Sequence, residues 1–316
     1  MSVTPKIKLI VVVGPTASGK TGLGIQLAQA IGGEIVSADS MQIYRYMNIG
    51  TAKPTPAELT KASHHLIDCL DPKQPYNAGK FVEDADRCIR EIDQRGKFAI
   101  VLGGTSLYIR ALVQGIIPVP DTPPKLKEEV HGMVEREGLA KVYERLKALD
   151  PKSASPLHPN DVSRICRAME VVLQTGRSIQ EFQNRHRFQS KRYDAYFLGV
   201  RWPREILYER INRRIVMMID EGLIEEVESL LQRGYDESLP SMKSIGYKQA
   251  CQYLKGEFSK EEMIADIQQK TRHYAKKQMT WYRKDESVVW LDQGNLTEEV
   301  KQDIVAFLHP DAKTTP

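Results

Sequence analysis

Residues 14–21, with the sequence GPTASGKT, constrain the fold of this chain more than any other feature. They match G-x-x-x-x-G-K-[ST], a pattern whose glycines let backbone N–H groups converge on phosphate oxygens. The pattern is credible only between a strand and a helix. A β-branched apolar run covers residues 7–13, and apolar residues recur at helical spacing over residues 20–31. The chain is therefore predicted to begin with a buried parallel strand, a phosphate-binding loop and a helix.

This loop is predicted to hold a phosphorylated ligand and Mg²⁺. The N-terminus of the following helix adds positive potential, Lys20 adds a point charge, and the hydroxyl of Thr21 can bind Mg²⁺. The ligand stays open, because the phosphates of a nucleotide and a free diphosphate present nearly the same oxygens. A chance glycine turn is the structural alternative. The predicted ligand-binding residues are Gly14, Pro15, Thr16, Ala17, Ser18, Gly19, Lys20 and Thr21.

Short apolar strands alternate with helices along the first third of the chain. Strands are predicted at residues 34–37 and 98–102, and the helix between them begins after Asn77 and ends at Gly96. Another helix starts near Thr105. Such alternation predicts an α/β fold, a P-loop core with a mainly parallel sheet flanked by helices. Later strands are predicted at residues 193–200 and 288–291.

A proline-rich stretch at residues 117–124 marks a predicted domain boundary. From residue 125 to about residue 192 the periodicity is helical, with one helix starting at Asp161. We therefore expect a catalytic core formed by residues 1–117 and 193–316, and an all-helical insertion domain formed by residues 118–192.

The composition excludes several classes of protein. The 316 residues carry 45 Lys and Arg against 41 Asp and Glu, for a net charge of +4, and 41% are hydrophobic. This mixture is typical of a globular chain and not of a fibrous or disordered one. No apolar run approaches the roughly 20 residues that a membrane helix needs, and no secretory signal is recognisable. We expect a cytoplasmic protein that acts as a monomer and does not contact membranes.

Cysteine and histidine spacing does not favour a metal centre. The four cysteines are scattered without a C-x-x-C pair, so neither a disulfide framework nor a zinc site is predicted. His64 and His65 are adjacent, and adjacent side chains on an extended strand point to opposite faces.

Asp39 is a candidate catalytic carboxylate. It follows the predicted strand at residues 34–37, and the carboxyl ends of parallel strands lie at the same sheet edge as the phosphate loop. A carboxylate there can bind Mg²⁺ or act as a general base, while capping of a turn is the structural alternative. An aspartate after residues 98–102 would favour a nucleoside triphosphate, but Gly103, Gly104 and Thr105 stand there.

Two stretches of the chain carry basic residues without an acid. Residues 183–193 contain Arg185, Arg187, Lys191 and Arg192, and they follow a predicted helix with Arg164 and Arg167. Residues 267–284 contain Lys270, Arg272, Lys276, Lys277, Arg283 and Lys284, interleaved with Tyr274, Trp281 and Tyr282. Such surfaces can follow a phosphate backbone and stack unpaired bases, whereas a solvated helix face is the simpler alternative.

Arg210 and Arg214 form a separate basic pair. They lie four residues apart on a predicted helix, so they share one face and could jointly clamp an anion. A surface ion pair with Glu205 or Glu209 is the alternative interpretation.

Together these motifs resemble the tRNA dimethylallyltransferases, also called tRNA isopentenyltransferases. Many families share the phosphate loop, but the loop followed by DSMQIYR at residues 39–45 and GTAKP at residues 50–54 is highly specific. Further matches cover nearly the whole chain, at residues 103–108, 158–161, 164–171, 244–247 and 277–283. Met169 replaces a more usual leucine, and the zinc-finger extension of many eukaryotic relatives is absent, so we expect a bacterial-type enzyme.

The resemblance implies Mg²⁺-assisted transfer of a dimethylallyl group from dimethylallyl diphosphate to N6 of the adenosine 3′-adjacent to the anticodon of tRNA. Lys20, Thr21 and the loop amides would hold the diphosphate, with Arg210 and Arg214 neutralising its charge. Asp39 would be the general base, and Thr105 would contact tRNA near the reaction channel. The insertion would grip the anticodon stem. The implied tRNA contacts are Asp39, Ser40, Met41, Gln42, Thr105, Ser163, Arg164, Ile165, Cys166, Arg167, Lys243, Ser244, Ile245, Gly246, Tyr247 and Lys248.

Three other functions remain open from the sequence. An enzyme that prenylates free adenine nucleotides would use a similar loop and aspartate, but such enzymes lack the helical insertion. A small-molecule kinase or ATPase would bind ATP at the loop and turn it over in the presence of Mg²⁺. A non-catalytic, GTPase-like RNA-binding module would carry an N-K-x-D guanine signature, which this sequence lacks.

Overall fold

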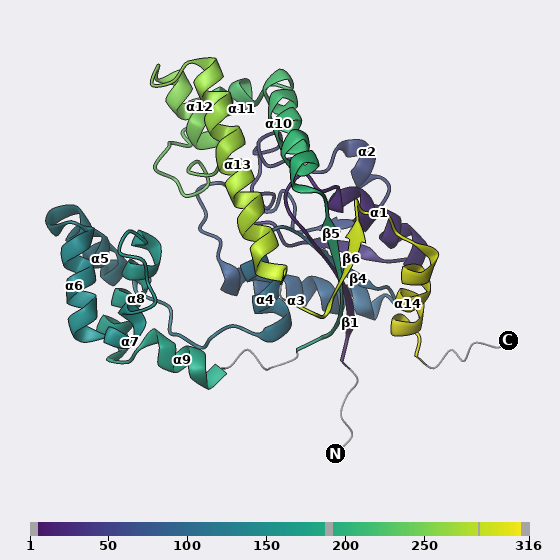
Figure 1. The fold of residues 1–316 in the computed structure, drawn as a ribbon, viewed down its shortest axis with the longest axis horizontal. Helices are drawn as coiled ribbons and strands as arrows, with labels where there is room; N and C mark the ends of the chain where they lie inside the picture. The colour runs from purple at the N-terminus through teal and green to yellow at the C-terminus, as the bar shows by residue number, and fades with distance from the viewer. Residues whose placement is uncertain (1–5, 187–191, 284, 311–316) are drawn as a thin grey trace. The chain divides into compact units, whose positions relative to one another are not determined.

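The computed structural model describes residues 6–186, 192–283 and 285–310 (Figure 1). The chain separates into two compact units, Met1–Val113 with Arg192–Pro316, and Gln114–Lys191. The first unit contains every described strand, and the second is helical in its described residues. The predicted α/β core with an all-helical insertion is therefore confirmed.

The first unit is built on a six-stranded sheet in the order β3-β2-β4-β1-β5-β6, and every neighbouring pair is parallel. The strands are β1 (Lys8–Val13), β2 (Glu34–Ser37), β3 (His64–His65), β4 (Ala99–Leu102), β5 (Asp194–Arg201) and β6 (Val288–Asp292). Five of these agree with the predicted strands. β3 has only two residues, which are too few to give a periodic signal in the sequence.

Side chains of β1 alternate between two apolar cores, one on each face of the sheet. Leu9 and Val11 belong to a core shared with α3 (Ala78–Gln94) and α4 (Ser106–Gln114). Ile10 and Val12 belong to a core shared with α1 (Lys20–Ile31) and α14 (Glu298–Leu308), which Figure 1 shows on one side of the strands. Burial on both faces explains why the strand is continuously apolar.

Of the remaining helices of the first unit, all but the short α2 (Pro56–Leu59) add residues to the core on the α3 side. The helices that do so are α10 (Arg204–Asp220), α11 (Leu223–Gln232), α12 (Tyr247–Leu254) and α13 (Lys260–Tyr282). Helix ends follow the predicted caps. The side chain of Asn77 accepts a hydrogen bond from the N–H of Lys80 (3.0 Å), and α1 ends at Gly32 in the left-handed conformation.

The loops that leave β1, β2 and β4 meet at one edge of the sheet, because the three strands are parallel. The loop after β4 packs directly on the loop after β2. A Cβ atom on Gly103 would lie 2.1 Å from the carbonyl oxygen of Ala38, so only glycine permits this approach. Asp39 is thereby held beside the phosphate loop.

The second unit is a small helical domain with its own apolar core. Its helices are α5 (Pro124–Glu137), α6 (Leu139–Leu149), α7 (Pro151–Ala154), α8 (Val162–Thr175) and α9 (Ile179–His186). Val130, Leu146, Ile165 and Met169 are fully buried in this core. The helix predicted from Asp161 is α8, whose first turn is capped by that side chain through the N–H of Arg164 (3.1 Å).

The first unit closes on itself where the second unit is inserted. The N–H of Arg192 donates to the carbonyl oxygen of Val113 (3.1 Å), so the residues that flank the insertion are hydrogen-bonded neighbours. The guanidinium of Arg192 also bonds Asp86 of α3 and the carbonyl oxygen of Leu112 (3.3 Å). Asp86 accepts a further bond from the hydroxyl of Tyr193 (2.5 Å). A single buried carboxylate thus fastens the start of β5 to α3.

Among the helices that the structure describes, none is both long enough and apolar enough to cross a bilayer.

Candidate functional site

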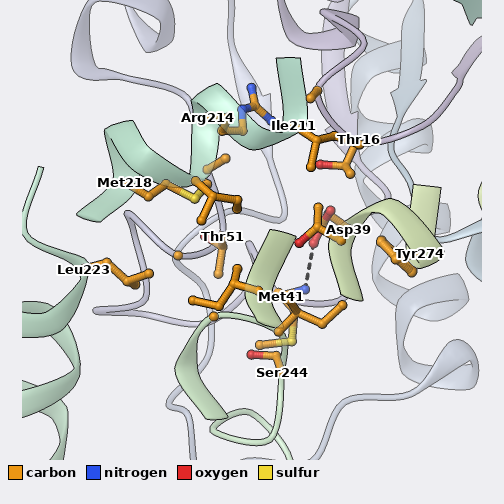
Figure 2. A pocket seen from close by; sticks show the side chains of 18 of the residues that line it. Thr16, Asp39, Met41, Thr51, Ile211, Arg214, Met218, Leu223, Ser244 and Tyr274 are labelled. Carbon is orange, nitrogen blue, oxygen red and sulfur yellow. Dashed lines mark hydrogen bonds between the residues drawn. The ribbon is translucent and has the colours of Figure 1, made fainter. Parts of the chain in front are cut away.

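Two adjoining cavities lie at the edge of the sheet where β1, β2 and β4 end. The polar cavity, of about 190 Å³, is lined by the phosphate loop, Asp39, Gln42 and Gln278. The apolar cavity, of about 400 Å³, is lined mainly by aliphatic side chains of α10 and its neighbours (Figure 2). Both share the lining residues Thr16, Ala17, Asp39, Thr51, Ala52, Arg214 and Tyr274. The two cavities therefore form one site with a phosphate-binding end and an apolar end.

The phosphate loop has the predicted position between β1 and α1, and its outer side is fastened to the rest of the core. Ala17 lies in the left-handed region with a φ of 61°, which costs free energy for a residue with a Cβ atom. Its carbonyl oxygen accepts from Nε of Arg210 (2.9 Å), and that of Ser18 accepts from Nε1 of Trp202 (2.9 Å). These contacts hold the strained loop in shape.

Lys20 is a partly buried cation at the base of the loop. Its Nζ donates to the carbonyl oxygen of Pro15 (2.7 Å). Burial lowers the pKa of Lys20 to about 8, and nearby Arg214 lowers it further while Asp39 opposes the change. Burial and the neighbouring Arg210 also lower the pKa of Arg214. Positive charge that is concentrated in this way is typical of a site for an anion.

The two arginines of α10 have different positions. Arg214 lines both cavities, as Figure 2 shows for the apolar one. Arg210 instead stacks on the ring of Trp202, 4.3 Å from its centroid, and bonds the outer side of the loop. In the described part of the chain neither arginine pairs with Glu205 or Glu209. Arg214 is thus placed for direct contact with a ligand, and Arg210 for support of the loop.

Asp39 both caps a turn and lines the cavities. Its Oδ1 accepts hydrogen bonds from the N–H groups of Met41 (2.8 Å) and Gln42 (3.3 Å). Figure 2 shows the carboxylate between Thr16 and Met41, with the bond to the Met41 N–H dashed. Oδ2 makes no hydrogen bond within the described residues. One oxygen therefore serves the fold while the other is available for chemistry.

Thr105 supports this turn from behind. Its Oγ1 accepts from the N–H of Ser40 (3.1 Å) and lies 3.4 Å from Oγ of Ser40, and its own N–H donates to Ala38 (3.2 Å). Thr105 is absent from the described residues that line either cavity. Its position is that of a residue that orients the Asp39 turn.

Gln278 and Tyr274 of α13 complete the site. From the sequence, Gln278 was not singled out, and Tyr274 was named only as an aromatic residue of the acid-free stretch. The amide of Gln278 accepts from the N–H of Thr16 (2.9 Å) and donates to the carbonyl oxygen of Gly104 (2.9 Å), so it joins two loops. Tyr274 lines both cavities, and desolvation raises its pKa to about 12. The available signal was their spacing of four residues inside the acid-free stretch, which places them on one helix face.

The segments implied to contact tRNA contain both exposed and buried side chains. Ile165, Cys166 and Tyr247 are buried, so only the other, accessible residues of these segments could contact RNA directly. Lys243, Ser244, Ile245 and Gly246 line the apolar cavity, and Lys248 is exposed. On α8, Ser163 and Arg164 are exposed, whereas the guanidinium of Arg167 bonds Thr122 and lies 3.2 Å from Glu170.

The two acid-free stretches are less open than their composition predicted. In the first, Arg192 is engaged by Asp86, while Arg187, Lys191 and the side chain of Arg185 lie outside the described residues. In the second, Lys270 pairs with Asp266 (2.7 Å) and Arg272 donates to Asn212 (2.7 Å). Lys276, Lys277 and Arg283 are exposed there, and Lys284 lies outside the described residues.

The oxygen atoms at the loop suit a magnesium ion that is shared with a phosphorylated ligand. Over residues 6–186, 192–283 and 285–310 no group of three or more His, Cys, Asp and Glu side chains could hold a metal. Thr21, Lys20 and Asp39 all line the polar cavity. In phosphate sites Mg²⁺ takes only one or two protein oxygens and completes its shell with water and phosphate, so this donor set fits.

The four cysteines and the histidine pair have structural positions. All four cysteines are free, and only Cys69 is exposed. His65 bonds Glu34 (2.7 Å), and Nδ1 of His64 lies 2.8 Å from the carbonyl oxygen of Ala62.

The chain is similar to known proteins over nearly its whole length. The family model described as IPP transferase matches residues 42–285. The tRNA dimethylallyltransferase of Geobacter metallireducens is 47% identical over 304 residues, which cover 96% of this chain and 98% of the relative. That of Myxococcus xanthus is 45% identical over 283 residues, covering 90% and 92%.

Solved structures show the same similarity. The full-length tRNA isopentenylpyrophosphate transferase of Bacillus halodurans aligns with a TM-score of 0.71 and 36% identity, covering 96% of this chain and 98% of that one. A eukaryotic dimethylallyltransferase that acts on tRNA aligns with a TM-score of 0.80 and 29% identity, covering 95% and 78%.

Proposed function

The chain belongs to the IPP transferase family, and we propose that it transfers the dimethylallyl group of dimethylallyl diphosphate to N6 of the adenosine that follows the anticodon of tRNA, giving N6-dimethylallyladenosine. One observation carries the proposal. Lys20 and Asp39 line a cavity that has a cationic phosphate loop at one end and an apolar wall at the other. That combination suits a ligand with a diphosphate head and a hydrocarbon tail.

In this proposal the diphosphate lies on the loop. Backbone N–H groups at the N-terminus of α1 point toward its oxygens, and Lys20 and Arg214 supply positive charge. Because Arg214 is partly buried beside other cations, its charge is more strongly felt by an anion than at the surface. These groups stabilise the charge that collects on the diphosphate as it leaves.

The transfer step breaks one bond and forms one. The lone pair of adenine N6 forms a bond to C1 of the dimethylallyl group while the bond between C1 and the bridging oxygen breaks, and diphosphate departs with that electron pair. The N6 proton passes to Oδ2 of Asp39, which makes no hydrogen bond in the described residues. An exocyclic amine is a poor nucleophile, so acceptance of its proton is the catalytic contribution of Asp39.

The apolar cavity would receive the hydrocarbon group and the base. Ile211, Met218 and Leu223 form an apolar wall, and Tyr274 lies near Asp39 (Figure 2). The target base must leave its stack to reach this depth, which a single-stranded loop permits at low cost. Exclusion of water by the same wall would protect the allylic carbon from hydrolysis.

Mg²⁺ is the proposed cofactor, held by the Thr21 hydroxyl and by diphosphate oxygens, and it would neutralise charge on the leaving group. Exposed Arg164 supports a role of α8 in gripping the anticodon stem. We place the reaction in the cytoplasm, where tRNA is available and where free thiols such as those of the four cysteines persist.

Mass spectrometry of an unmodified anticodon stem-loop tests the proposal. After incubation with the protein, Mg²⁺ and dimethylallyl diphosphate, we expect a gain of one five-carbon unit on the adenosine after the anticodon. Modification of free AMP in place of the stem-loop would favour an adenine-nucleotide prenyltransferase. No mass gain, together with rapid ATP hydrolysis, would favour the kinase or ATPase alternative.

A further inference from the structure

One carboxylate outside the cavities connects two of their walls. Glu226, in the first turn of α11, accepts hydrogen bonds from three successive backbone N–H groups, those of Asn48 (2.8 Å), Ile49 (2.9 Å) and Gly50 (3.3 Å). The hydroxyl of Tyr247, at the start of α12, donates a fourth bond to it (2.6 Å). Glu226 is absent from the described residues that line the cavities.

The groups bonded by Glu226 belong to the cavity wall or lie directly behind it. Gly50, Thr51 and Ala52 line the apolar cavity, as does Gly246 next to Tyr247. A Cβ atom on Gly50 would lie 2.4 Å from Cε2 of Tyr247, so the loop backbone packs directly on that buried ring. The loop at residues 48–52 and the turn at residues 243–247 are therefore held in one fixed arrangement.

The same loop is linked to the proposed base. Nε2 of Gln42 donates to the carbonyl oxygens of Thr51 (3.3 Å) and Ala52 (3.0 Å), and the N–H of Gln42 donates to Oδ1 of Asp39 (3.3 Å). Glu226 is thus connected to Asp39 by hydrogen bonds to the loop backbone, by that backbone itself, and by the hydrogen bonds of Gln42.

We propose that Glu226 is a positioning residue for the transfer reaction, because its carboxylate fixes the loop at residues 48–52 and the Gly246–Tyr247 turn as the wall that receives the RNA base. Hydrogen bonds to an ionised acceptor are stronger than those between neutral groups. Within the described residues, the backbone N–H groups of Asn48, Ile49 and Gly50 have no partner other than Glu226. The phosphate loop makes no described contact with Glu226, and of the loop at residues 48–52 only Thr51 and Ala52 reach the polar cavity, so diphosphate binding should depend on Glu226 less than binding of the base does. The kinetic consequence rests on the proposed function, whereas the structural consequence does not.

Glu226→Gln tests this role with little change in shape. Its amide turns one acceptor oxygen into a donor that faces other donors. We expect KM for the stem-loop to rise at least about tenfold, which corresponds to the loss of one or more charge-assisted hydrogen bonds. KM for dimethylallyl diphosphate should stay within about threefold of the wild-type value. Glu225→Gln is the matched control, since Glu225 is exposed and shares the favourable position in the first turn of α11.

The two KM values separate positioning from simple destabilisation. Partial unfolding lowers the concentration of active enzyme, and hence the apparent kcat, without changing either KM. A Glu226→Gln protein that changes only in apparent kcat, or that matches Glu225→Gln throughout, would overturn the proposal. An equal rise in both KM values would also overturn it, because the phosphate end should be affected less than the wall that receives the base.

Hydrogen exchange gives a readout that needs no activity. We expect faster exchange of the amides of residues 48–50 in full-length Glu226→Gln, with unchanged exchange in residues 14–21. Tyr247→Phe, which removes one of the four bonds, should give a smaller change in the same direction even if Glu226→Gln folds poorly. Unchanged exchange at residues 48–50 in both variants would contradict the role. Wild-type protein that transfers no dimethylallyl group would contradict the proposed function alone.

Discussion

At the scale of the residue, the carboxylate of Asp39 divides its two oxygens between the fold and the cavity. Oδ1 caps the turn through the N–H groups of Met41 and Gln42, and Oδ2 has no partner in the described residues. The sequence could identify this residue from its place after the second strand. It could not show that capping, which competed with catalysis as an interpretation, uses only one of the two oxygens and leaves the other for the proposed proton transfer.

Asp39→Asn should separate the two roles. Asparagine keeps an acceptor oxygen for the Met41 and Gln42 N–H groups but cannot take the N6 proton, so we expect kcat to fall by about 10²-fold to 10⁴-fold. Binding of the stem-loop, measured by fluorescence anisotropy, should stay close to that of the wild type. Asp39→Ala removes the cap as well and is expected to weaken binding. Wild-type turnover by Asp39→Asn would refute the base role.

The charge of Lys20 should make ligand binding sensitive to pH. Burial lowers the pKa of this amine from 10.5 to about 8, so its charge is lost as the pH rises through that value. An anion prefers the charged form, and we expect the affinity for a non-reacting diphosphate analogue to fall by up to about tenfold per pH unit above pH 8. Calorimetric titration from pH 7 to pH 9.5 measures this effect.

Lys20→Met supplies the comparison for that titration, since it should bind weakly and with little dependence on pH in the same range. A wild-type affinity that stays constant above pH 8 would contradict the argument. The lowered pKa was not predictable from the loop pattern, because Arg214 lies far along the chain and burial depends on the packing of α10 over the loop.

At the scale of the element, α13 links the two loops that surround the phosphate end of the site. The amide of Gln278 bonds Thr16 in one loop and Gly104 in the other while only 5% of its surface is exposed. Apolar spacing over Met263 and Ile267, both buried in α13, is typical of a helix, but the bounds of this helix were not predicted from the sequence. It gave no reason to prefer Gln278 over Gln269, because both are uncharged residues in a polar helix.

Gln278→Leu should therefore cost stability as well as activity. It leaves the N–H of Thr16 and the carbonyl oxygen of Gly104 without their partner, and we expect the free energy of unfolding to fall by about 1–3 kcal/mol. Gln269→Leu carries the same substitution at an exposed site of the same helix and should change it little. Urea titration of both variants measures this difference. Equal midpoints would show that the two hydrogen bonds of Gln278 contribute nothing to stability.

At the scale of the whole molecule, the chain combines a parallel α/β core with a helical insertion, and both were predictable from alternation and from the proline-rich joint. The face of α8 that is accessible was less well predicted. A contiguous segment at residues 163–167 was expected to contact tRNA, yet a helix turns successive residues to different sides. Ile165 and Cys166 accordingly belong to the core of the insertion, and Arg164 is exposed.

Arg164→Ala should weaken stem-loop binding through the loss of one phosphate contact. We expect the slope of log affinity against log salt to become shallower by about one unit. Lys152→Ala is the matched control, because the Lys152 side chain is 70% exposed against 72% for Arg164. Arg167→Glu is a poor probe, since it would set a second acid beside Glu170. A salt slope that Arg164→Ala leaves unchanged would place RNA recognition elsewhere.

The hydrogen bond between Arg192 and Val113 also bears on how such a chain can change over evolutionary time. Because the insertion leaves and rejoins the core at one bonded pair, its length and sequence do not set the register of β5 beside β1. The insertion thus replaces what would otherwise be a short loop between two adjacent residues of the core. Lengthening, trimming or exchanging it should leave the phosphate loop and Asp39 in place, so that, under the proposed function, RNA recognition by the insertion can diverge while the chemistry is inherited unaltered.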